Sequence, residues 1–123
     1  MIRLGIDAVD VDRFRALLDR RPLVRSRLFT PGELAALAER ADPVPGLAAR
    51  FAAKEAAMKA LSTGLGGIDF ADVEVLRGPG GEPTLSVSGR AAARASSMGV
   101  GSWGVSLTHT ASMAAAVVVA EAD

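Results

Sequence analysis

The sequence contains no cysteine and no tyrosine, and it has one histidine and one tryptophan among its 123 residues. Without cysteine the chain forms no disulfide and carries no thiolate, and a single histidine argues against a zinc site. The sequence also lacks a nucleophile elbow, a G-x-G-x-x-G motif and a P-loop. Thiol chemistry is therefore excluded, and the commonest nucleotide-binding loops are absent.

The chain also has no excess of charge of either sign, because fourteen basic residues balance fourteen acidic ones. Overall charge therefore gives no reason to expect nucleic acid or a membrane surface as a partner. No apolar run approaches the ~20 residues that a membrane-spanning helix needs. Half of the residues are hydrophobic. We expect one soluble, cytoplasmic domain that spans residues 1–123.

Periodicity and turn residues divide the first half of the chain into one strand and three helices. Residues 2–9 form a β-type run, and apolar residues at helical spacing follow from Asp10 to about Arg21. The stretch FTPGE, residues 29–33, contains a capping box and a proline at the first helical position, which predicts the start of a helix. After a breaker at residues 41–46, an alanine-rich helix runs to about Leu61.

The second half of the chain predicts two β-hairpins separated by a helix. Residues 72–89 form two strands with a Gly/Pro turn, and residues 102–122 form two strands with a polar turn at residues 109–112. The helix between them ends at Gly99. This order of elements predicts an α+β fold, with a mainly antiparallel sheet packed against the long alanine-rich helix.

The alanine-rich helix carries three charges beside its apolar stripe, which at roughly 100° per residue consists of Leu47, Phe51, Met58 and Leu61. Lys54 falls within the stripe, and Glu55 and Lys59 flank it. One interpretation is a surface Glu55–Lys59 pair, worth only ~0.3–0.5 kcal/mol, with Lys54 extending its ammonium group to water. The other is a charged site, because a carboxylate among closely packed neighbours needs a partner or a metal.

Asp7 provides a second carboxylate, at the end of the first predicted strand. At such a position an aspartate is either a metal ligand or a turn or cap residue. Two oxygen ligands leave most of the octahedral shell of Mg²⁺ open to water and to substrate phosphates. Asp7 together with Glu55 therefore suits phosphate chemistry better than tight metal storage.

Two further segments each allow a structural and a functional interpretation. His109 is either a satisfied turn residue or part of a phosphate-binding surface with the hydroxyl groups of Ser106, Thr108 and Thr110. Six arginines lie between Arg13 and Arg27, against two aspartates. They form either a solvated helix face or a docking surface for an acidic partner.

These pieces, in this order, resemble the holo-[acyl-carrier-protein] synthases, the small type of 4′-phosphopantetheinyl transferase. The resemblance rests on four segments that cover nearly the full length: GIDAVDVDRF (5–14), FTPGE (29–33), RFAAKEAAMKAL (50–61) and WGVSLTHTASMAAAVVVAE (103–121). It implies transfer of 4′-phosphopantetheine from coenzyme A to a serine of an apo acyl carrier protein, which is generally acidic. It also implies a homotrimer with active sites between subunits.

The resemblance carries over residue by residue. Asp7 and Glu55 match the Mg²⁺ ligands, Lys59 the lysine near the transferring phosphate, and His109 the histidine beside the coenzyme. Further coenzyme-binding positions are Ser62, Gly64, Ser106 and Thr108, and Arg13 matches an arginine that meets the carrier protein. The arginine cluster itself adds Arg20 and Arg21 as predicted docking positions for the carrier. Ser62 and Thr110 depart from the residues that relatives carry, glycine and, in some, aspartate.

The general base remains open at this point, between Glu55 acting through a bound water and a deprotonated Lys59. Two other functions are also compatible with the sequence. One is a non-catalytic trimeric module that binds coenzyme A or a carrier protein, and the other is a different Mg²⁺-dependent nucleotide enzyme. The identity of the carrier, from fatty-acid, polyketide or peptide synthesis, is not encoded in these motifs.

Overall fold

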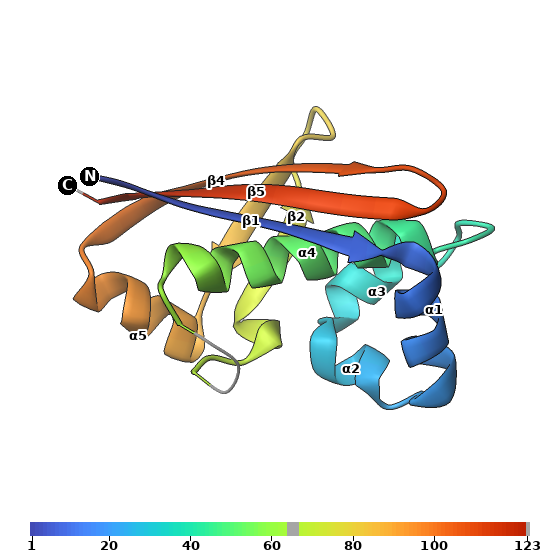
Figure 1. The fold of residues 1–123 in the computed structure, drawn as a ribbon. Helices are drawn as coiled ribbons and strands as arrows, with labels where there is room; N and C mark the ends of the chain where they lie inside the picture. The colour runs from blue at the N-terminus through green and yellow to red at the C-terminus, as the bar shows by residue number, and fades with distance from the viewer. Residues whose placement is uncertain (64–66, 123) are drawn as a thin grey trace.

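The computed structural model describes residues 1–63 and 67–122 of the chain. A three-stranded antiparallel sheet has the strand order β1 (Ile2–Asp10), β5 (Met113–Ala122) and β4 (Val100–His109). Helix α4 (Val44–Ala60) runs along one face of this sheet (Figure 1). The predicted α+β fold, with an antiparallel sheet on the long alanine-rich helix, is confirmed.

Small residues allow α4 to lie very close to the sheet. The side chains of Ala52, Ala53, Ala56 and Ala57 are fully buried. On β1, a Cβ atom added to Gly5 would lie 1.7 Å from the carbonyl oxygen of Ala56. Because the helix and strand backbones approach this closely, polar side chains on α4 and β1 also lie near one another.

Three short helices cover the end of α4 near the carboxyl end of β1 (Figure 1). They are α1 (Val11–Arg20), α2 (Val24–Leu28) and α3 (Pro31–Leu37). Asp10 caps α1 by accepting a hydrogen bond from the Arg13 N–H, at 2.9 Å. The predicted capping box of Thr30 and Glu33 is present at the start of α3.

The remaining elements form a smaller layer beside α4. The 3₁₀ turn η1 (Phe70–Asp72) leads into β2 (Val73–Arg77), which pairs with β3 (Pro83–Val87) as the predicted hairpin. Helix α5 (Gly89–Ser97) follows, and Gly99 adopts the left-handed conformation, with φ +75°, just after its end. In the described residues, no helix has the length and apolar character needed to cross a membrane.

Several predicted details are wrong. Asp7 does not end the first strand, because β1 continues to Asp10 along a complete ladder with β5. Helix α4 begins at Val44, inside the predicted breaker, since a proline in the first helical turn needs no N–H acceptor. Lys54 does not reach water, because its side chain is fully buried. Helix α2 was not predicted, as five residues are too few to show a helical period.

Candidate active site

Asp7, Glu55 and Lys59 meet where β1 lies against α4. The ammonium group of Lys59 donates hydrogen bonds to Asp7 Oδ1 at 3.1 Å and to the carbonyl oxygen of Ile6 at 2.7 Å. The Asp7 side chain is mostly buried, with 13% of its surface exposed, whereas that of Lys59 is 55% exposed. Lys59 is therefore anchored to the strand while its charge remains accessible from solvent.

Glu55 lies in the same hollow as Asp7, and its side chain is half-buried. Burial raises the pKa of Glu55, the charge of Asp7 raises it further, and Lys59 partly opposes both effects. Because these two carboxylates repel each other in one hollow, an additional positive charge between them would be favourable. The pair therefore fits a divalent cation that prefers oxygen ligands and keeps other positions open.

This hollow, which we call the carboxylate hollow, has a volume of about 370 Å³. Its apolar lining comes from Val9, Phe14, Leu17 and Phe51. Arg13 and Arg20 of α1 also line it. A ligand with a charged end and an apolar body can therefore lie here, with cationic side chains at its rim.

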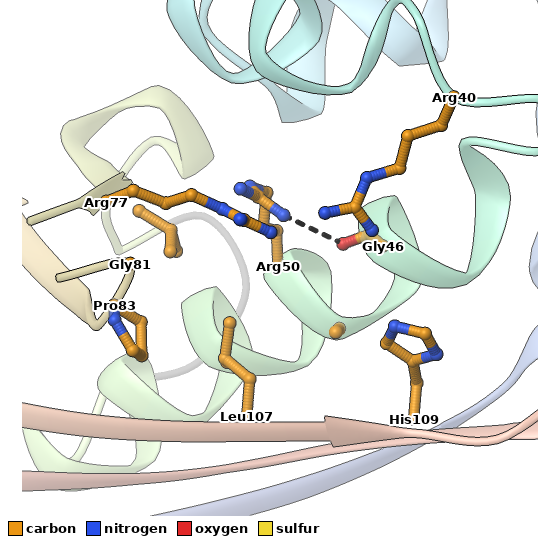
Figure 2. A pocket seen from close by; sticks show the side chains of 10 residues that line it. Arg40, Gly46, Arg50, Arg77, Gly81, Pro83, Leu107 and His109 are labelled. Carbon is orange, nitrogen blue, oxygen red and sulfur yellow. Dashed lines mark hydrogen bonds between the residues drawn. The ribbon is translucent and has the colours of Figure 1, made fainter.

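A second hollow of about 210 Å³ gathers basic side chains on the other side of α4 (Figure 2). Arg40, Arg50, Arg77 and His109 line this arginine hollow, from four different parts of the chain. Arg50 is 4% exposed, and its Nη1 donates a hydrogen bond to the carbonyl oxygen of Gly46 at 3.5 Å. Its Nε is buried and has no partner among the described residues.

The positive charges of the arginine hollow repel one another. Burial lowers the pKa of Arg50, the cations Arg77 and Arg40 lower it further, and Glu33 opposes these effects. The buried Arg50 and the exposed Arg40 and Arg77 converge on this hollow without an equal number of acidic partners, an arrangement that suits anions such as phosphate. The sequence gives no local signal for these arginines, because their convergence depends on packing between α4, β2 and the segment before α4.

The two hollows lie at opposite edges of the sheet. The carboxylate hollow lies at β1 and the arginine hollow at β4, with β5 between the two strands. The structure thus brings Asp7, Glu55 and Lys59 together but leaves His109 apart from them. Ser106 and Thr108 line a shallow hollow on the outer face of the sheet, and strand alternation places them opposite to His109.

These features match one family over nearly the whole chain. A family model described as the 4′-phosphopantetheinyl transferase superfamily matches residues 3–118. The chain belongs to this superfamily. A relative from Beutenbergia cavernae, a holo-[acyl-carrier-protein] synthase, is 50% identical over 122 residues, which cover 98% of each chain.

Solved structures of phosphopantetheinyl transferases agree with this assignment. The holo-[acyl-carrier-protein] synthase of Neisseria meningitidis has a TM-score of 0.88 and 31% identity, covering 98% of this chain and 99% of its own. A complex of the synthase from Chronobacterium ammoniagenes with coenzyme A has a TM-score of 0.88 and 27% identity, covering 100% and 98%. This chain therefore has the transferase fold over its whole described length.

The remaining predicted positions of the transferase differ in their surroundings. Arg13, Arg20 and Arg21 are exposed, whereas Arg15 is held by two hydrogen bonds to Asp42, at 3.0 and 2.7 Å. Ser62 has a φ of +52°, in the left-handed region where a glycine would be unstrained. Gly64 lies outside the described residues. Within residues 1–63 and 67–122, no three His, Cys, Asp or Glu side chains form a potential metal cluster.

Proposed function

We propose that this protein transfers the 4′-phosphopantetheine group from coenzyme A to a serine of an apo acyl carrier protein. The products are the holo carrier protein and adenosine 3′,5′-bisphosphate, and the reaction serves fatty acid or polyketide biosynthesis in the cytoplasm. The observation that carries this proposal is the convergence of Asp7, Glu55 and Lys59 in a chain of this superfamily. A module that only binds coenzyme A or a carrier protein would not require two carboxylates and a lysine in one centre.

The phosphoryl transfer needs positioning and charge neutralisation more than covalent chemistry. Asp7 and Glu55 would hold Mg²⁺, which when bound supplies positive charge to the coenzyme A pyrophosphate. Lys59 would add a cation at the phosphate that moves with the arm, and its hydrogen bond to the Ile6 carbonyl oxygen keeps the ammonium group in place. All three groups lie on rigid elements, β1 and α4.

Glu55 is the better candidate for the general base. It lies in the same hollow as Asp7, on the rigid helix α4. It would accept the proton of the carrier's serine hydroxyl group through a bound water. Lys59 donates hydrogen bonds to the Ile6 carbonyl oxygen and to Asp7 Oδ1, which suits a role as a cation.

Coenzyme A carries a 3′-phosphate in addition to its pyrophosphate, and the two hollows suit two separate phosphate groups. The arginine hollow would bind the 3′-phosphate through Arg40, Arg50, Arg77 and His109. One chain presents its hollows at opposite edges of the sheet. A single coenzyme A would therefore lie between the carboxylate hollow of one subunit and the arginine hollow of the next.

The outer face of the sheet supports a homotrimer with such shared sites. Ile2, Leu4 and Ile6 of β1 are 64%, 66% and 67% exposed, and Val117 on β5 adds to the same face. An exposed apolar patch of this kind marks an interaction surface. Association through this face would cover these side chains, and it would bring Ser106 and Thr108, which lie on the same face, beside a neighbouring subunit.

The experiment that tests the proposed function is mass spectrometry of a purified apo carrier protein after incubation with coenzyme A, Mg²⁺ and this protein. We expect the carrier mass to increase by one phosphopantetheine group. The matched control is Asp7→Asn, which keeps the size of the side chain but removes a charge from the centre. An unmodified carrier with tight binding of coenzyme A would instead establish the non-catalytic module.

A further inference from the structure

A fully buried ion pair joins Glu33 of α3 to Lys54 of α4. Lys54 Nζ lies 2.7 Å from Glu33 Oε1, and both side chains are completely inaccessible to solvent. The other two ammonium protons bond to the carbonyl oxygens of Phe70 and Val73. All three donors of the ammonium group are therefore used, which is what a buried cation requires.

The same pair closes the free edge of β2. Strand β2 pairs with β3 along one edge, and along the other edge Lys54 bonds to the Val73 carbonyl oxygen while Glu33 Oε2 accepts from the Val75 N–H at 3.0 Å. Two side chains thus take the place of a neighbouring strand. They fix the distance and register between α4 and β2.

Helix α4 and strand β2, which this pair links, each carry an arginine of the arginine hollow. Arg50 lies one helical turn before Lys54 on α4, and Arg77 lies two residues after Val75 on β2. Val75 itself lines the hollow. In Figure 2 the side chains of Arg50 and Arg77 lie beside each other over the cavity. The contacts of Glu33 and Lys54 therefore link the two elements that carry these arginines.

We propose that Glu33 and Lys54 are positioning residues, which hold α4 and β2 so that Arg50 and Arg77 converge on one phosphate group. Neither residue touches the hollow. The proposal rests on the proposed binding of the coenzyme A 3′-phosphate there. Glu33 also supplies the buried negative charge that opposes repulsion among the arginines.

The test compares coenzyme A with dephospho-coenzyme A, which lacks the 3′-phosphate. The readout is the ratio of kcat/KM for the two substrates. A partly unfolded preparation lowers both values equally and leaves their ratio unchanged. Glu33→Gln removes one acceptor oxygen, so Lys54 and Val75 are no longer both satisfied. We expect the ratio to fall about tenfold, a coupling typical of residues within one hydrogen-bond network.

Three further variants complete the experiment. Glu33→Asp keeps the charge but is too short to span both contacts, so it provides a milder variant in which a smaller fall is expected. Glu74→Gln is the control. It removes a carboxylate of β2 that accepts a hydrogen bond from Thr30 Oγ1 and not from Lys54, and the ratio of kcat/KM values should not change. Arg50→Ala removes a group of the hollow itself and should abolish the preference for coenzyme A.

The outcomes separate the two proposals. An unchanged ratio in both Glu33 variants, together with a lost preference in Arg50→Ala, would overturn the positioning role and leave the phosphate site standing. An unchanged ratio in Arg50→Ala would overturn the phosphate assignment and the positioning role with it. Transfer to the carrier protein would still be measured with either substrate.

Discussion

Glu55 carries its negative charge in surroundings that oppose it, because its side chain is half-buried and Asp7 lies in the same hollow. Glu55→Gln removes this charge at nearly constant size. We expect kcat to fall by about 10²-fold or more, the contribution of a positioned general base. The melting temperature in metal-free buffer should rise at the same time, since unfavourable burial of the charge is relieved.

The stability difference between wild type and Glu55→Gln should depend on pH. A carboxyl group with a raised pKa in the folded protein is protonated at low pH in both the folded and the unfolded state, so no penalty exists there. The penalty develops as pH rises from the ordinary pKa of a glutamate towards the raised pKa of Glu55, and it is complete above that raised pKa. Thermal unfolding with EDTA at about pH 4 and about pH 7.5 checks this. Equal differences at the two values would contradict it.

Ser62 has a left-handed backbone, with φ +52°, directly after α4. A side chain in this conformation is strained by about 1 kcal/mol relative to glycine. Ser62→Gly should therefore raise the free energy of unfolding by about 1 kcal/mol, measured by urea denaturation. The control Ser96→Gly lies within helix α5 and should lower stability. A destabilised Ser62→Gly would show that the serine side chain makes a stabilising contact.

At the level of elements, the close contact of β1 and α4 depends on one glycine. Gly5→Ala would place a methyl group against the Ala56 carbonyl oxygen, and we expect a loss of about 3 kcal/mol in unfolding free energy. In Gly32→Ala, the added methyl meets only the ends of the Glu74 and Thr30 side chains. That control should change stability by less than about 1 kcal/mol. Similar losses in the two variants would contradict this account.

Helix α1 and the segment after it present the proposed docking surface for an acidic carrier protein. The double variant Arg20→Glu with Arg21→Glu should raise KM for the carrier, mainly through slower association. Added salt should weaken wild-type carrier binding. Arg15→Ala is the control, because Asp42 already pairs with this arginine. A carrier KM that responds to neither charge reversal nor salt would leave these arginines as a solvated face.

Local signals predicted elements well, and contacts between distant elements were not predictable. Thr30 and Glu33 lie three residues apart, so their capping box is visible in the sequence. The second role of Glu33, as the partner of Lys54, depends on a helix 21 residues further along. Arg50 gave no signal for the same reason, because its neighbours Arg40 and Arg77 are brought to it by the fold.

At the level of the whole molecule, the separation of the two hollows makes subunit mixing a direct test of shared sites. Glu55→Gln removes one half of each site and Arg50→Ala impairs the other. If subunits of the proposed trimer exchange at random, about one quarter of the interfaces would combine two intact halves. We expect a 1:1 mixture, after subunit exchange, to regain about one quarter of wild-type kcat/KM for coenzyme A. Activity equal to the mean of the two separate variants would contradict sites between subunits.

The chain has only two lysines, and their exposure to solvent differs completely. Lys54 is sealed inside the protein with every ammonium proton bonded, and Lys59 stands with 55% of its side chain exposed at the carboxylate hollow. An amine-directed acylating reagent applied to the native protein would therefore modify Lys59 and the terminal amine and leave Lys54 untouched. Covalent labelling thus offers a dye or crosslinker attachment point at the proposed catalytic centre, without introducing any engineered residue.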